Sequence, residues 1–255
     1  MNVGGEMNGT GEREVAVGCC GWSEARARYF EHFPIIELQT PFYEMPAPAL
    51  AAKWRQAAPP GFQFFIKAWQ LITHTPASPT YRRLKIPVEA CDRDLLGSFR
   101  PTEQVWLAWQ RTQAVARALN AQVILFQCPA SFKPTAENIR NFREFFQRID
   151  RDSCRLAWEP RGNWPAELVR NLCAEFNLVH CVDPFQTSSV YGDNVYWRLH
   201  GRGSYFYTYS GEEIEWLKQQ ALARIAEGSE GVSILFNNTS MKNDALRLGA
   251  GLLVK

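Results

Sequence analysis

The sequence predicts an α/β protein of the (β/α)8 TIM barrel class, folded as a single domain. Eight short segments rich in Val, Ile and Phe alternate with longer segments of helical periodicity. The chain has 255 residues, a usual size for one such barrel. No internal repeat, low-complexity tract or linker divides it. A doubly wound open sheet also fits the alternation, but the count of eight strands favours the closed barrel.

The predicted strands are short apolar segments whose lengths suit a buried parallel sheet. In chain order they cover residues 14–18, 34–38, 63–67, 122–127, 155–159, 178–182, 195–199 and 232–236.

Apolar residues at spacings of three and four predict helices over residues 48–58, 102–119 and 136–149. Ser210 and Glu213 match a capping box, in which Ser210 accepts from the third helical amide and Glu213 reaches back. We therefore expect a helix through Ile214, Leu217 and Ala221. A last helix should open after the Asn237–Ser240 segment that follows strand eight.

Composition excludes several classes of protein. Lys plus Arg is 28 and Asp plus Glu is 26, so the net charge of +2 argues against binding driven by global charge and against an acidic tail. With 46% apolar and 21% charged residues, the chain is typical of a soluble globular protein. Its apolar runs are far shorter than the roughly 20 residues that span a bilayer, so no membrane association is expected.

Cysteine usage indicates a reducing compartment, and we expect a cytoplasmic protein. The seven cysteines are odd in number, two of them adjacent, and none forms a Cys-x-x-Cys pair. A structural zinc site therefore has no support. Residues 1–13 lack the apolar stretch of a secretory signal and are predicted to be a flexible tail before a barrel domain over residues 14–255.

One connection departs from the regular alternation of strands and helices. Residues 68–101 carry four prolines and form an excursion after the third strand much longer than an ordinary loop. Two interpretations stay open: a packed surface segment with short turns of its own, or a lid that faces a substrate.

Polar residues stand at or just beyond the strand ends, where a barrel carries its chemistry. Since buried charges are costly unless paired, this pattern favours a common site at the barrel mouth. The candidates for catalysis are Glu37, Lys67, Glu159, Asp183 and His200; those for substrate binding include Gln127, Arg161, Arg198, Asn237 and Asn238. The alternative is a closed ionic network in which the carboxylates only pair with the basic groups.

Lys67 has two functional interpretations, a neutral amine that forms a Schiff base and a fixed cation that holds an anionic oxygen. Neighbouring carboxylates favour the charged form, so we expect the cation.

Anion binding is expected near the last two strands. The loop His200-Gly201-Arg202-Gly203-Ser204 and the helix start at Asn237–Ser240 resemble the phosphate corner of many barrels. Arg202 is a further candidate anion ligand there, and Tyr43 and Tyr209 are candidate walls for a ring-bearing ligand.

No cofactor is evident, although a divalent metal remains an option. Glu159, Asp183 and His200 on successive strands offer mixed oxygen and nitrogen ligands.

A series of motifs carries a resemblance to a known family. These are Gly18-Cys19-Cys20-Gly21-Trp22, Glu37 with Phe42-Tyr43, Trp54 with Lys67, Ile72-Thr73-His74, Gln127 to Phe132, Glu159-Pro160-Arg161, Arg198 to Gly201 and Phe236-Asn237-Asn238. The chain resembles the YecE-like family, domain-of-unknown-function family 72, over essentially the whole predicted domain. The resemblance implies a (β/α)8 barrel and adds His74 to the substrate-binding candidates.

The resemblance also has departures and limits. Cys19-Cys20 and Gln39-Thr40-Pro41 stand where the family usually has small hydroxyl residues and an Asn, so hydrogen-bonding roles at the first two strand ends are not carried over. The family's barrel is more distantly similar to metal-dependent sugar isomerases and to endonucleases that cut at abasic sites, an analogy of fold only.

Three functional hypotheses follow. The first is an enzyme that uses acid/base chemistry on a phosphate-bearing or otherwise anionic small molecule, sugar or nucleotide. The second is a non-catalytic module that binds nucleic acid or a partner protein, which should show a basic stripe. The third is a divalent-metal-dependent phosphodiesterase, endonuclease or sugar isomerase.

Overall fold

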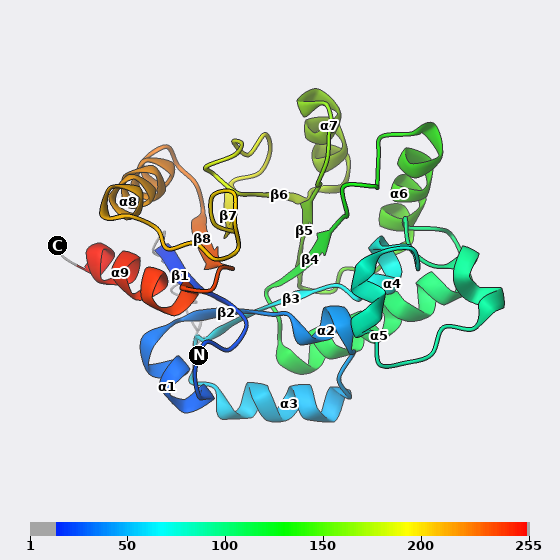
Figure 1. The fold of residues 1–255 in the computed structure, drawn as a ribbon, viewed down its shortest axis with the longest axis horizontal. Helices are drawn as coiled ribbons and strands as arrows, with labels where there is room; N and C mark the ends of the chain where they lie inside the picture. The colour runs from blue at the N-terminus through cyan, green and yellow to red at the C-terminus, as the bar shows by residue number, and fades with distance from the viewer. Residues whose placement is uncertain (1–13, 254–255) are drawn as a thin grey trace, which may run out of the picture.

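The computed structural model describes residues 14–253, and in this part of the chain eight parallel strands close into a barrel in the order β1 to β8 (Figure 1). The predicted TIM barrel is confirmed. The predicted tail, residues 1–13, lies outside the described residues.

All eight predicted strands are present, with ends shifted by at most two residues. The strands are β1 (Glu14–Cys20), β2 (Ile35–Leu38), β3 (Gln63–Lys67), β4 (Val123–Gln127), β5 (Arg155–Glu159), β6 (Val179–Val182), β7 (Asn194–Leu199) and β8 (Gly231–Phe236). The largest shift is in β1, which runs on to Cys20 because its last three residues pair with β2, ending in the pair Cys20 and Glu37.

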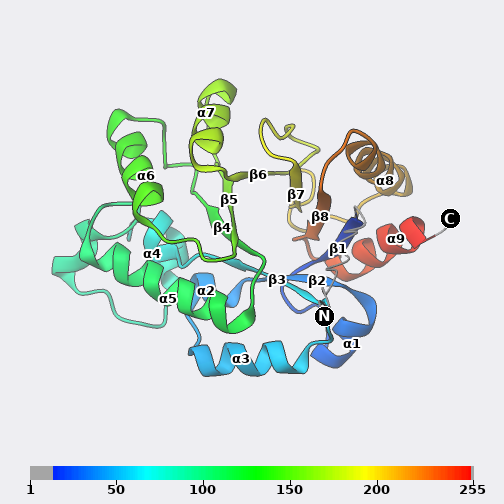
Figure 2. The same cartoon turned by 180° about the vertical axis from the view of Figure 1, so that it is seen from behind.

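The helices lie outside the barrel and cover its strands (Figures 1 and 2). Those predicted are confirmed, including the capping box formed by Ser210 and Glu213 at the start of α8. The helix α7 is not among the predictions, although Val169, Leu172 and Phe176 bury one face at helical spacing. The helices are α1 (Arg26–His32), α2 (Thr40–Tyr43), α3 (Pro48–Ala57), α4 (Gln70–Thr73), α5 (Glu103–Leu119), α6 (Ala136–Arg148), α7 (Ala166–Phe176), α8 (Gly211–Ala226) and α9 (Met241–Leu253).

The alternation of strand and helix fails between β6 and β7. The connection, residues 183–193, contains no helix and appears in Figure 1 as a yellow loop between α7 and α8. Its sequence includes Pro184 and Gly192 and has no apolar stripe at helical spacing, which accounts for the missing helix. Val190 ties the loop to the barrel, since its amide donates to His180 Nδ1 at 3.2 Å.

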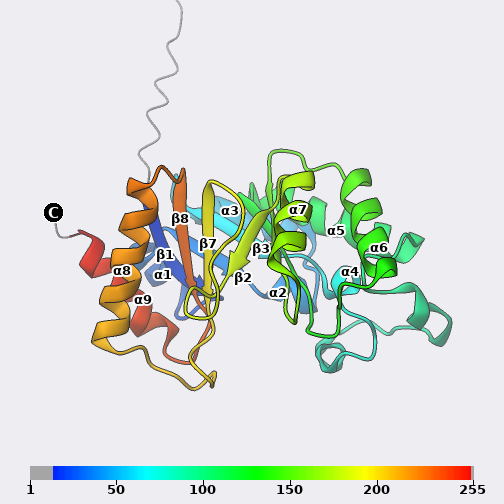
Figure 3. The ribbon, with the colours of Figure 1, turned by 90° about the horizontal axis from the view of Figure 1, so that it is seen from above.

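The excursion after β3 is a packed segment with short turns of its own, the first of the two interpretations. It holds α4 and two 3₁₀ helices, η1 (Pro79–Arg83) and η2 (Ala90–Leu95), and projects from one side of the barrel (Figure 3). The amides of Gly97 and Phe99 donate to Leu71 and Ile72 carbonyls at 2.8 and 2.9 Å, and the Phe99 side chain is fully buried. The excursion therefore folds back onto its own first turn.

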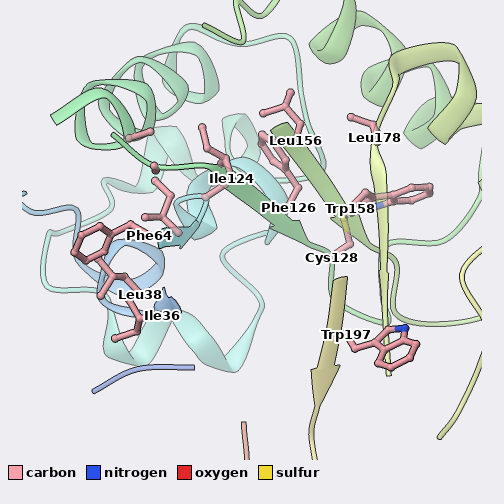
Figure 4. Close-up of a cluster of buried hydrophobic side chains, with 14 of the residues drawn as sticks. Ile36, Leu38, Phe64, Ile124, Phe126, Cys128, Leu156, Trp158, Leu178 and Trp197 are labelled. Atoms are coloured by element: carbon pink, nitrogen blue, oxygen red, sulfur yellow. Dashed lines mark hydrogen bonds between the residues drawn. The ribbon is translucent and has the colours of Figure 1, made fainter. Parts of the chain in front are cut away.

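The buried residues of the strands fall into two sets, one on the outside of the barrel wall and one on the inside. Residues such as Phe64, Ile124 and Trp158 face the helices (Figure 4). Their neighbours one position along, including Phe65 and Leu125, fill the barrel interior. Because strand side chains alternate, this parity also decides which strand-end residues point inward.

None of the helices within residues 14–253 combines the length and apolar character needed to cross a bilayer.

Candidate functional site

The alternation along the strands aims the polar strand-end residues at the barrel mouth. On β3, Phe65 lies in the interior and Lys67 follows two residues later on the same face. The same step leads from Ala157 to Glu159 on β5 and from Tyr196 to Arg198 on β7. These side chains therefore converge on the barrel mouth, as the strand ends predicted, because side chains alternate along each strand.

Arg198 is the centre of a buried ionic network. Its Nε and Nη2 donate to the two oxygens of Glu37 at 2.7 and 2.9 Å, and its Nη1 donates to Glu159 Oε2. The hydroxyl of Tyr196 and the amide of Gln39 also donate to Glu37. Arg198 and Glu37 are fully buried, so this pair forms a sealed platform beneath the mouth.

Glu159 links the platform to the surface. Arg161 Nε and Nη2 donate to Glu159 Oε1 at 3.0 and 2.9 Å, and the side chain of Arg161 is 40% exposed. Burial alone would raise the pKa of Glu159, but the guanidiniums of Arg198 and Arg161 outweigh it and hold this pKa well below the usual range. Glu159 is therefore a fixed anion.

His200 lies above the platform of Arg198 and Glu37, and its neighbours determine which ring nitrogen carries the proton. Arg161 Nη2 lies 2.7 Å from His200 Nε2, and the Asn237 amide lies 3.0 Å from Nδ1. Because a guanidinium carries only donors, we assign the lone pair to Nε2, which also lies 3.3 Å from Glu159 Oε1. The proton is then on Nδ1, and the amide of Asn237, whose nitrogen is placed 3.0 Å from Nδ1, is assigned in the flipped orientation. Burial lowers the pKa of His200, and the nearby Glu159 carboxylate opposes this shift, so the neutral form of the ring is favoured.

Asp183 closes the other side of the mouth. It accepts the amides of Phe185 at 3.0 Å and of His200 at 3.3 Å, and the side chain of Gln186 at 3.2 Å. Burial raises the pKa of Asp183 in spite of these donors. No basic group within the described chain forms an ion pair with it.

Lys67 does not pair with the carboxylates that were expected to keep it charged. Its Nζ donates to Gln127 Oε1 at 2.9 Å and lies 3.7 Å from the centre of the Phe42 ring. Glu37 and Glu159 are bound to Arg198 instead. Burial, followed by the charge of Arg198, lowers the pKa of Lys67 to about 7, so the carboxylates expected to favour its charged form do not set its pKa.

A cavity of about 380 Å³ opens at the mouth beside these groups. Strands β5 and β6 pair only at Ala157 with Val179 and at Trp158 with His180, and their ends part beyond that point. Predicted residues that line the cavity are Glu159, Arg161, Asp183 and His200; His180, Gln186 and Thr187 line it without having been predicted. His180 precedes the end of β6 by two residues, so inspection of strand ends misses it.

Several predicted binding residues use their polar atoms within the fold. Arg202 pairs with Glu213 at 2.9 Å on the first turn of α8. Tyr209 is buried, and its hydroxyl accepts the Gly201 amide at 2.9 Å. Asn238 is buried too and donates to Asp244 Oδ2 at 2.8 Å. Through these contacts the three residues stabilise the loop after β7 and the start of α9.

Tyr43 and His74 lie on the side of the excursion. Tyr43 contacts Arg83, whose guanidinium carbon is 3.7 Å from the ring centre. His74 is buried against Phe42, with ring centres 5.0 Å apart, and its Nδ1 is 2.8 Å from Thr73 Oγ1. Burial lowers the pKa of His74 to about 3, so this ring is neutral.

The predicted phosphate corner is filled by the chain itself. The Thr239 amide donates to the Tyr205 carbonyl at 3.1 Å, and Ser240 Oγ is 2.6 Å from Thr208 Oγ1. The loop after β7 thus occupies donors at the start of α9 that a phosphate would need.

The residues proposed for a divalent metal do not fit one. Glu159 carries two guanidiniums, and a metal ion at its oxygens would stand beside both charges. Within residues 14–253, no three His, Cys, Asp or Glu side chains are grouped to hold a metal ion. Two buried cysteines at strand ends, Cys19 and Cys128, offer no thiolate in their place, because burial raises the pKa of Cys19 to about 12 and also raises that of Cys128.

Comparison with known proteins agrees with the predicted resemblance. The UPF0759 protein YunF of Bacillus subtilis is 23% identical over 242 residues, which are 83% of this chain and 79% of YunF. A DUF72 family structure from Enterococcus faecalis V583 has a TM-score of 0.75 at 21% identity and covers 96% of this chain and 99% of its own. A xylose isomerase domain containing protein from Salmonella typhimurium LT2 shares the fold with a TM-score of 0.59 at 11% identity, covering 94% of this chain and 98% of its own. The model of the family described as "Protein of unknown function DUF72" matches residues 16–254, and the chain therefore belongs to the DUF72 family.

Proposed function

We propose that this protein is an enzyme that uses acid/base chemistry on an anionic small molecule at the carboxyl end of its barrel. The observation that carries the proposal is the 380 Å³ cavity, which Arg161, Asp183 and His200 line together. A half-exposed cation and two titratable groups with shifted pKa values around one cavity are the parts that such chemistry requires.

Arg161 is the anchor for the anion. Its guanidinium reaches solvent, whereas its partner Glu159 keeps a second, buried cation in Arg198. When Arg161 turns to a bound phosphate or carboxylate, Glu159 keeps its contact with Arg198. The guanidinium geometry also suits two parallel hydrogen bonds to such a group.

His200 and Asp183 supply the proton transfer. The His200 ring is neutral with its lone pair on Nε2, the nitrogen that faces Arg161 at 2.7 Å. An anion that draws Arg161 away frees this nitrogen to act as a base. Burial raises the pKa of Asp183, whereas the pKa of Glu159 is lowered, so Asp183 is the carboxyl group of the cavity better suited to carry a proton.

The alternatives have less support. A nucleic-acid-binding module needs unpaired basic side chains along one face, but the two arginines predicted to bind an anion at the mouth, Arg161 and Arg202, both pair with carboxylates. The proposed location in the cytoplasm has separate support, because all seven cysteines are free, which is typical of a reducing compartment.

Phosphate binding tests the anchor. We expect inorganic phosphate and small phosphorylated sugars to raise the melting temperature, because a ligand that prefers the folded state stabilises it. Arg161→Met should abolish the rise. Arg143→Met, which removes a surface arginine paired with Glu175, should leave it intact. An Arg161→Met protein that keeps the full phosphate response would contradict the proposal.

The acid/base step is tested by hydrogen exchange in D2O. Phosphorylated aldoses and ketoses are incubated with the protein, and loss of the proton signal next to the carbonyl is followed by NMR. We expect exchange with at least one compound, and His200→Asn should slow it by about 10²-fold or more. No exchange above the rate without protein would count against this chemistry.

A further inference from the structure

His180 lies where the wall of the barrel opens into the cavity. In the parallel register it pairs with Trp158, and this is the last pair before the ends of β5 and β6 part. Beyond this pair His180 lines the cavity of about 380 Å³ together with Arg161, Asp183 and His200. The residue is only 6% exposed, so its ring is held in the wall and meets solvent at the cavity.

The loop from β6 to β7 fixes both the ring of His180 and its proton. The Val190 amide lies 3.2 Å from His180 Nδ1, and a backbone amide can only donate, so Nδ1 carries the lone pair. In the neutral ring the proton is therefore on Nε2. Ser189 Oγ donates to the His180 carbonyl at 3.3 Å, which holds the backbone of the same residue. The proton position thus follows from a backbone group, whereas that of His200 depends on how the Asn237 amide is oriented.

The N–H at Nε2 of His180 is left for a ligand. Within residues 14–253 Nε2 has no hydrogen-bond partner, and it is not among the unpartnered polar atoms that are sealed from solvent there. Because the ring is already held in place beside the cavity, this N–H binds a ligand oxygen without reorganisation of the protein. Burial also lowers the pKa of His180 to about 4, so the ring stays neutral near pH 7.

The charges around the cavity indicate which oxygen this N–H binds. Of the described residues that line the cavity, Arg161 is the one permanent cation, whereas Asp183 and Glu159 carry carboxyl groups. A second anionic group on the ligand would therefore face carboxyl groups without a cation of its own. A neutral donor that cannot become an acceptor fits an uncharged oxygen that only accepts, such as that of a carbonyl group.

We propose that His180 Nε2–H binds the carbonyl oxygen of an aldehyde or ketone whose single anionic group is held by Arg161. This inference rests on the proposed function and names its substrate class. His200 takes a proton from the carbon next to the carbonyl; the electron pair of that C–H bond forms a C=C bond, and the negative charge moves to the carbonyl oxygen. The hydrogen bond from His180 stabilises this charge. A proton then returns from His200 to carbon and restores the carbonyl, so the step needs no other reactant.

NMR of the full chain labelled with ¹⁵N at histidine tests the proposal. The chain has four histidines, and the spectrum of His180→Gln identifies the signals of His180. We expect the free protein at pH 7 to carry the proton of this ring on Nε2. Dihydroxyacetone phosphate or pyruvate is then added, with glycerol 3-phosphate and lactate as the matched compounds in which a hydroxyl group replaces the carbonyl. We expect the Nε2 signal to move further with a carbonyl compound than with its match, and the two pairs distinguish a phosphate from a carboxylate requirement.

Two variants separate the donor at Nε2 from the contact that fixes the loop. His180→Gln keeps an acceptor for the Val190 amide and an N–H for the ligand, so it should still bind the carbonyl compound more tightly than its match. His180→Met has neither group; it should lose a preference of about tenfold and slow hydrogen exchange next to the carbonyl by about 10²-fold. Melting curves show whether each variant folds, and the NMR result on the natural chain does not depend on them.

The outcomes distinguish this inference from the proposed function. A proton on Nδ1 of His180, or an Nε2 signal that moves no further with the carbonyl compounds than with their matches, would overturn the proposal, as would an unchanged preference in a folded His180→Met. If Arg161→Met still abolishes the stabilisation by phosphate in that case, the proposed function stands and only the role of His180 is refuted. If no anion binds through Arg161, the proposed function fails and this inference fails with it.

Discussion

At the scale of single residues, Arg198 organises the barrel mouth. Its planar guanidinium binds Glu37 through two parallel hydrogen bonds and Glu159 through a third nitrogen. A lysine has one charged nitrogen and could not hold two carboxylates in this geometry. Burying these three ions costs free energy, and the cost is offset only while each ion keeps its partners.

Glu37→Gln therefore should be strongly destabilising. It removes one of the two carboxylates of the network and leaves Arg198 and Arg161 with Glu159 alone, so one positive charge loses its partner, which should lower the free energy of unfolding by about 3 kcal/mol. Urea denaturation measures the change. Glu175→Gln breaks the half-exposed pair with Arg143 and should cost less than about 1 kcal/mol. Equal losses in the two variants would refute this account of the platform.

At the scale of elements, the connection from β6 to β7 makes the cavity possible. Because residues 183–193 form no helix, the space between α7 and α8 is left to a loop (Figure 1). Asp183, Gln186 and Thr187 of this loop line the cavity. The loop is fixed by His180, whose Nδ1 accepts the Val190 amide and whose carbonyl accepts Ser189 Oγ at 3.3 Å.

Acid should weaken this attachment, because protonated His180 cannot accept the Val190 amide. Burial lowers the pKa of His180 in the folded chain to about 4, below the roughly 6.5 of an unfolded histidine. The contribution is therefore fully present above about pH 6.5 and is lost as the pH falls toward 4, at up to about 1.4 kcal/mol per pH unit.

The measurement is the free energy of unfolding in urea between pH 7 and 4. His180→Gln offers an acceptor oxygen that does not titrate, so its stability should fall less steeply with pH than that of the natural chain. The buried rings of His74 and His200, whose pKa values are also lowered, should preserve part of the slope. Identical slopes for the two proteins would show that His180 does not act in this way.

At the scale of the whole molecule, closure of the barrel depends on a close approach between β1 and β2. Gly18 pairs with Ile35 in the parallel register, and a Cβ on Gly18 would lie 2.1 Å from the Ile35 carbonyl oxygen. The same contact brings Cys20 opposite Glu37, so it also places a member of the ionic platform. A side chain at Gly18 must push the two strands apart.

Gly18→Ala should consequently lower the free energy of unfolding by about 3 kcal/mol, near the upper end of the cost of overpacking. Thermal and urea denaturation measure the loss. Gly249→Ala is the matched control: its Cβ would meet nothing within 4 Å on α9, and alanine favours a helix by about 0.5–1 kcal/mol. A Gly18→Ala protein as stable as the natural chain would contradict the described closeness of β1 and β2.

Local sequence was sufficient to predict the barrel and the membership of its mouth. Strand periodicity marks Glu37, Lys67, Glu159 and Arg198 as strand-end residues, and a barrel necessarily gathers its strand ends. The capping box at Ser210 likewise depends on residues three positions apart. These features are local or follow from topology, so a single sequence reveals them.

The pairing of charges was decided by tertiary structure alone. Whether Glu37 and Glu159 bind Lys67 or Arg198 depends on side-chain reach across the barrel interior, which strand periodicity does not contain; they bind Arg198. Lys67 is left with Gln127, and its pKa falls instead of staying high. Tertiary structure likewise decides that the loop after β7 contacts the start of α9. It also separates the ends of β5 and β6, which leaves the cavity at His180. The order of strand-end residues thus specified which groups meet, while distances between segments far apart in the chain determined how each group is charged.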